Sequence, residues 1–214
     1  MSVLRVFLFF AIIFLPFLSN AQKVLGEGTV VYKAVLTRPD GSKKEGTYTI
    51  TVKNKQVRKD LKIGSDFENV QILDNSEKAY ILRSMNDKNF AVEMSMADLL
   101  RKNERYYDPE IKDASESKNI AGMKAQKAVV TYKDGTTAEL FYTKEWKADI
   151  PFAFERYRGL NGFPVAFDYK NDQGAVINFE VVTFDQNVVE SSKFKIPNGY
   201  KVISGEEYKK LKTK

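Results

Sequence analysis

Alternation of apolar and polar residues with a period of two runs through most of this chain and indicates a fold made mainly of strands. It is clearest where Tyr48, Ile50 and Val52 share one face while the threonines beside them share the other. Such alternation is typical of a strand that buries one face. Residues 29–36 form a second β candidate, and residues 38–41 between the two contain the proline and glycine of a tight turn. We therefore expect a hairpin here.

Further strand candidates recur along the chain, separated by short runs rich in turn residues at spacings of roughly 8 to 12 residues. The polar residues 113–119 are expected to lie outside the strands, and residues 146–159 to form a loop and a short helix. About ten short strands with such turns indicate a barrel or a sandwich. The further candidates are residues 56–63, 70–73, 78–85, 90–94, 123–133, 137–143, 165–169, 176–184 and 188–194.

Two helices are expected among these strands. Ser95 followed three places later by Asp98, and Ser204 followed by Glu207, have the spacing of a helix N-cap and its reciprocal acid. The first predicts a helix of about three turns across the sheet, and the second a short C-terminal helix. The apolar residues of the first helix fall on one side: Met96, Leu99 and Leu100. We expect them to cover a hydrophobic cavity, facing Phe163 and Phe167.

The first 21 residues have the order of a cleavable signal peptide. Arg5 precedes an apolar run over residues 6–17, which is shorter than the roughly 20 residues that a membrane helix needs. Small side chains then precede a cleavage site between Ala21 and Gln22. We therefore expect a periplasmic or secreted protein with residues 22–214 as its single domain. Because the chain has 0 Cys, it has no lipobox cysteine for an acyl anchor.

Composition excludes several kinds of chemistry. The chain has 0 His and 0 Cys, which excludes thiol nucleophiles, Ser-His triads and histidine-ligated zinc. Its 28 acidic residues are scattered along the chain, so two of them are expected to lie close together by chance. Such a pair is therefore no specific sign of an acid–base catalytic site. We expect no enzyme, no metal and no cofactor. The net charge of +6 is diffuse, which argues against a nucleic-acid partner and leaves peripheral contact with an anionic membrane surface as a candidate.

Three segments resemble a known group of exported proteins. Residues 118–124, Lys-Asn-Ile-Ala-Gly-Met-Lys, and residues 159–164, Gly-Leu-Asn-Gly-Phe-Pro, are similar to a Bacteroidota family of unknown function related to the GLPGLI proteins. Residues 194–201 resemble the Phe-x-x-Pro-x-Gly-Tyr ending shared with lipoprotein carriers of the LolA and LppX type. Asn161 stands where the GLPGLI loop usually has proline, and Ala125 where many relatives have cysteine. The resemblance implies an α+β, mostly β fold: an open antiparallel half-barrel covered by a helix and loops.

Aromatic and basic residues are interleaved after Trp146. This pattern has two interpretations: ordinary core beneath a long loop, or the mouth of a hydrophobic cavity with arginines at its rim. The second suits an amphiphile with an anionic head, because arginine binds phosphate or carboxylate through two parallel hydrogen bonds. The residues expected to form the cavity or its mouth here are Trp146, Phe152, Phe154, Arg156, Tyr157, Arg158, Leu160 and Phe163.

Two functions therefore remain open. The first is a periplasmic carrier or sensor of a lipid or other amphiphile bound in the half-barrel. The second is a non-enzymatic envelope protein whose half-barrel is solidly packed and whose partner is another envelope protein. A hollow concave face would favour the first function, and a face filled by bulky side chains the second.

Overall fold

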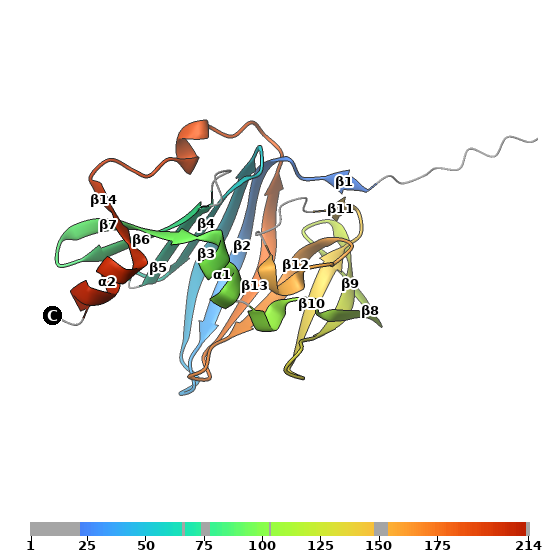
Figure 1. The fold of residues 1–214 in the computed structure, drawn as a ribbon. Helices are drawn as coiled ribbons and strands as arrows, with labels where there is room; N and C mark the ends of the chain where they lie inside the picture. Colours follow the sequence, from blue (N-terminus) through green and yellow to red (C-terminus); the bar gives the residue numbers. More distant parts are fainter. Residues whose placement is uncertain (1–21, 66, 74–77, 103, 148–153, 213–214) are drawn as a thin grey trace, which may run out of the picture.

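The computed structural model describes residues 22–65, 67–73, 78–102, 104–147 and 154–212 (Figure 1). Twelve strands form one large, twisted sheet that stays open, so the expected mostly β half-barrel is confirmed. Two short strands, β1 (Lys23–Val24) and β11 (Trp146–Lys147), pair with each other. The strands of the large sheet are β2 (Glu27–Thr37), β3 (Lys43–Lys53), β4 (Gln56–Ile63), β5 (Phe67–Leu73), β6 (Lys78–Met85), β7 (Lys88–Ser95), β8 (Glu110–Ile120), β9 (Met123–Thr131), β10 (Thr137–Thr143), β12 (Phe163–Lys170), β13 (Val176–Asp185) and β14 (Tyr200–Ser204).

The order of strands across the sheet is β14, β7, β6, β5, β4, β3, β2, β13, β12, β10, β9, β8. Strands β2 to β7 form a continuous antiparallel meander. A second antiparallel group, made of β8, β9, β10, β12 and β13, joins it through the pairing of β13 with β2. Residues early and late in the chain therefore lie in one sheet. The curvature of this sheet creates a concave face, which we define as the face that carries Tyr32, Tyr48 and Phe179.

Both predicted hairpins are confirmed. Strands β2 and β3 pair along their whole length, and Gly41 in their turn has a left-handed φ of +82° and donates its N–H to the Arg38 carbonyl at 2.9 Å. Strands β9 and β10 pair around Gly135, which has a φ of +79° and donates to the Tyr132 carbonyl at 2.9 Å. Glycine suits both positions because a side chain would strain this part of backbone space.

Both predicted helix starts are confirmed as well. The described α-helices are α1 (Met96–Lys102) and α2 (Gly205–Lys212). The Asp98 N–H donates to the Ser95 hydroxyl oxygen at 3.1 Å, and the Glu207 N–H donates to the Ser204 hydroxyl oxygen at 3.1 Å. In the second cap Glu207 also accepts from the Ser204 N–H at 2.8 Å. These bonds satisfy N–H groups that have no partner inside the helix.

Helix α1 is shorter than expected. It has 7 residues rather than three turns, and the chain continues as the 3-10 turn η1 (Glu104–Tyr106). In that turn Tyr106 is buried, with its ring centroid 4.9 Å from that of Tyr132. Tyr106 packs there in a cluster with Val130, Tyr132 and Leu140 of the sheet and its turn.

The polar residues 113–119 were expected outside the strands, and this expectation was wrong. They belong to β8, an 11-residue strand at the edge of the sheet whose side chains are mostly exposed. An edge strand meets solvent on its free side, so it needs no alternation of apolar residues to be stable. The Gln126 amide holds the irregular part of this strand by donating to the carbonyls of Ala114 and Glu116.

The strand expected over residues 188–194 is absent from the described chain. That segment contains the 3-10 turn η3 (Ser191–Phe194), and the next strand is β14, which pairs in parallel with β7. Phe194 is buried, and Ile196 packs on the convex face of the sheet against a cluster of Val70, Ile72, Leu82 and Ala91. The segment therefore covers the back of the sheet instead of extending it.

Candidate functional site

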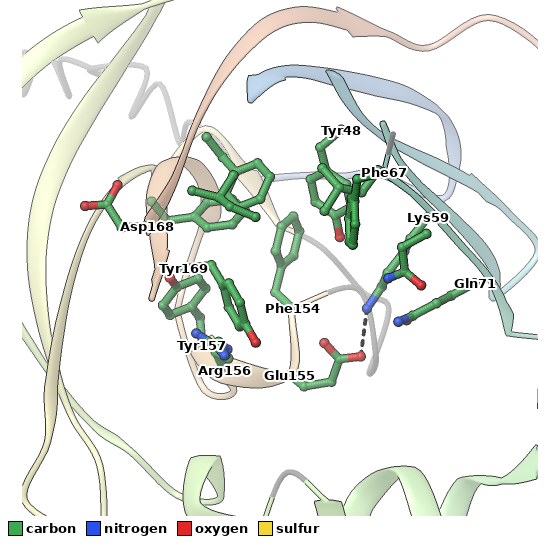
Figure 2. Close-up of a pocket in the computed structure, with 15 residues that line it drawn as sticks. Tyr48, Lys59, Phe67, Gln71, Phe154, Glu155, Arg156, Tyr157, Asp168 and Tyr169 are labelled. Carbon is green, nitrogen blue, oxygen red and sulfur yellow. Dashed lines mark hydrogen bonds and ion pairs between the residues drawn. The ribbon is translucent and has the colours of Figure 1, made fainter. Parts of the chain in front are cut away.

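A pocket opens on the concave face, between strands β4 and β5 on one side and the 3-10 turn η2 (Glu155–Tyr157) on the other (Figure 2). Its volume is about 320 Å³. Strands β3, β12 and β13 supply its floor, so residues far apart in the sequence meet around it. This pocket is the candidate functional site.

Aromatic rings form the floor of the pocket. Phe167 stacks on Phe179 with ring centroids 4.9 Å apart, and Tyr48 lies 5.1 Å from Phe179. Phe154 meets the ring of Phe167 edge-on at 6.1 Å. Burial raises the pKa of the Tyr48 hydroxyl, so the ring stays neutral at physiological pH. The floor is therefore apolar and uncharged, which suits a hydrophobic ligand.

An ion pair closes one side of the pocket. The Lys59 ammonium lies 2.7 Å from a carboxylate oxygen of Glu155, and the two side chains are only 7% and 19% exposed (Figure 2). Lys59 occupies an inward position of β4 between Val57 and Leu61 because successive side chains alternate between the faces of a strand. The pair ties the turn η2 to β4 and neutralises both charges.

Two arginines of the same segment have different positions. The guanidinium carbon of Arg156 lies 4.6 Å from the ring centroid of Tyr106 and 4.1 Å from that of Tyr169, and Arg156 lines the pocket. The guanidinium carbon of Arg158 lies 4.7 Å from the ring centroid of Tyr107, and Arg158 is not part of the pocket lining. Only the first of the two is placed to contact a ligand there.

The residues expected to form a cavity or its mouth fall into several groups in the structure. Those that line the pocket are Phe154, Arg156, Tyr157 and Phe167. Those buried in the main core cluster are Leu99, Trp146 and Phe163. Leu160 packs on a second cluster around Tyr157. The described part of the structure does not include the side chains of Met96 and Leu100 or any atom of Phe152 and Ala21. At the expected cleavage site it does include Gln22, whose side-chain amide donates to the Lys144 carbonyl at 3.0 Å.

Strands β4 and β5 contribute pocket residues that the sequence did not reveal. Lys59, Asn69 and Gln71 all line the pocket. The sequence holds one sign of this site: Lys59 is a charged residue on the same strand face as the apolar Val57 and Leu61. Alternation alone does not say that these positions border a cavity.

Two further properties concern the described residues. Among them, no group of three or more His, Cys, Asp and Glu residues is placed to hold a metal ion. Within the same residues, no helix has the length and apolar character needed to cross a membrane.

Comparison with known proteins gives matches to solved structures at low sequence identity. No protein-family model matches the chain, and no curated protein matches it. An uncharacterized conserved protein from Thermus thermophilus is 12% identical with a TM-score of 0.52, over 86% of this chain and 92% of that one. This likeness shows that the two share a fold.

Two other matched structures belong to the type that the C-terminal residues resemble. A LolA superfamily protein from Nitrosomonas europaea is 10% identical with a TM-score of 0.37, over 80% of this chain and 91% of that one. The lipoprotein LppX from Mycobacterium tuberculosis is 8% identical with a TM-score of 0.40, over 77% of this chain and 90% of that one.

Proposed function

We propose that this chain is a non-enzymatic binding protein that holds a small hydrophobic or amphipathic ligand in the concave pocket. The observation that carries the proposal is the pocket itself, a hollow of about 320 Å³ with an aromatic floor. Ligand sites in proteins span about 300 to 1,000 Å³, so this volume suits a short chain or a single ring system. Several long acyl chains would not fit.

Polar groups at the walls support the same proposal. Asn69 and Gln71 stand on β5 at the pocket, opposite the apolar rings of the floor. Pockets for small molecules combine apolar walls with a few polar groups that orient the ligand. An amphipathic ligand would place its apolar part on the floor and its polar part near these groups.

Filling the pocket tests this function. We expect Gln71→Trp to weaken binding of a fluorescent fatty acid by about tenfold or more, because the indole would occupy the ligand's space. Glu68→Trp is the matched control, since Glu68 lies on the same strand but is exposed and outside the pocket lining. Titration of the probe into each folded variant measures the two dissociation constants.

Two results would contradict the proposal in different ways. Equal binding by both tryptophan variants would mean that the probe occupies another site. No binding by the wild-type protein would favour the alternative function, an envelope interaction or structural protein with a packed half-barrel. That alternative draws support from the aromatic rings, which already fill much of the concave face around Phe163 and Phe167.

We also propose that the chain is exported and acts in the periplasm or outside the cell. The charged start, the short apolar run and the small residues before Gln22 support this proposal. We expect the mature protein to begin at Gln22, and intact-mass measurement on material from its own envelope fraction checks this. A mass that includes residues 1–21 would contradict it.

A further inference from the structure

The sheet separates beside the pocket. Strands β10 and β12 pair between residues 140–143 and 163–167, while residues 137–139 of β10 continue along β9 and residues 168–170 of β12 continue along β13. Figure 1 shows the two groups of strands diverging from this point. A second hollow, of about 490 Å³, lies here and is lined by residues of both strands.

Arg156 lines both hollows, so it stands at their junction. Its guanidinium lies against the rings of Tyr106 and Tyr169, at 4.6 and 4.1 Å from their centroids. Contacts of a cation with aromatic rings hold the group in place without a hydrogen-bond acceptor for its five N–H donors. Within the described part of the chain, this guanidinium forms no hydrogen bond and no ion pair.

Other charged residues line the two hollows as well. Lys59, Glu155 and Asp168 line the concave pocket, and Glu139, Asp168, Lys170 and Asp172 line the second hollow. The Lys59 ammonium pairs with Glu155 at 2.7 Å. The Asp168 carboxylate accepts a hydrogen bond from the Asn178 amide at 2.7 Å, and Figure 2 shows it directed away from the pocket. Of the two described cations that line the concave pocket, Lys59 is paired and Arg156 forms no ion pair, so Arg156 is the one available to bind an anionic group there.

We propose that the ligand of the concave pocket carries an oxyanion, a carboxylate or a phosphate, and that Arg156 binds it at the junction of the two hollows. The proposal rests on the proposed binding function and names the chemical class of its ligand. A guanidinium held between two aromatic rings can present two parallel N–H groups to such an oxyanion. The apolar part of the ligand then lies on the aromatic floor.

Four probes with the same eight-carbon tail test this proposal: octanoate, octyl phosphate, octyl glucoside and octyltrimethylammonium. Calorimetric titration of the wild-type protein should show one or both anions bound more tightly than the neutral probe, and the cation bound most weakly. The anion that binds with the lower dissociation constant shows whether the pocket prefers a carboxylate or a phosphate head group. This ranking needs no variant, so it tests the proposal even if a substitution at Arg156 prevents folding.

Substitution of the arginine supplies the second test. We expect Arg156→Met to weaken binding of the favoured anion about ten- to a hundredfold while changing octyl glucoside binding little. Arg156→Lys should recover part of the loss, because lysine keeps the charge but not the planar fork. Arg158→Met is the matched control: Arg158 also lies over a tyrosine ring but is outside both hollows.

The outcomes separate this proposal from the function on which it rests. If octyl glucoside binds as tightly as the anions and Arg156→Met changes nothing, the pocket binds ligands but the oxyanion proposal is wrong. An equal loss in Arg156→Met and Arg158→Met also overturns it, because the effect would then come from general positive charge. If no probe binds the wild-type protein, the binding function itself is wrong.

Discussion

Phe163→Ala is expected to lower the free energy of unfolding by about 3 to 5 kcal/mol, the cost of removing a large side chain from a packed core. Phe163 is 1% exposed, and its ring meets those of Phe154 and Phe184 edge-on at centroid distances of 5.1 and 5.3 Å. The substitution removes these contacts and leaves a cavity beneath the pocket. Urea denaturation measures the loss as a lower midpoint with an unchanged slope.

Phe67→Ala is the control for that measurement. Phe67 lies at the pocket but is 47% exposed, so we expect its removal to cost about 1 kcal/mol or less. A loss at Phe163 no larger than the loss at Phe67 would mean that the hollow extends to Phe163. The concave face would then be open rather than packed beneath the pocket.

Lys59→Met is expected to cost about 3 to 5 kcal/mol, because it leaves the Glu155 carboxylate partly buried and without its partner. The two groups lie 2.7 Å apart and are largely shielded from water. Glu155→Gln added to Lys59→Met should restore part of the stability, since no unpaired charge then remains. A double-mutant cycle from chemical denaturation gives the coupling, which should reach about 1 to 3 kcal/mol.

The pair of Lys62 and Glu68 is the matched control. Lys62 lies on the same strand as Lys59 but on its other face, and its ion pair with Glu68 is more than half exposed at both ends. Because exposed pairs contribute little, Lys62→Met should cost less than about 1 kcal/mol. Equal costs at Lys59 and Lys62 would contradict the buried character of the first pair.

Helix α1 illustrates what periodicity can and cannot predict. The spacing of its apolar residues correctly placed Leu99 on a buried side, and Leu99 lies in the main core cluster with Phe163. We expected the same residue to line a cavity, but the pocket lining does not include it. The helical spacing of apolar residues indicates which side chains are shielded from water. It does not report whether protein atoms or empty space lie opposite, so binding at α1 stays a prediction.

The strands of the first meander, the two hairpin turns and the two helix caps followed from the sequence alone. Each depends on neighbours only a few residues apart, such as Ser95 and Asp98 or the two sides of Gly41. The tertiary structure alone decided the order of the strands, the parallel pairing of β14 with β7 and the contact of Lys59 with Glu155, 96 residues away. It also placed Arg156 between Tyr106 and Tyr169. These contacts form only when the sheet curves and distant segments meet, and no local pattern records which partners the curvature selects.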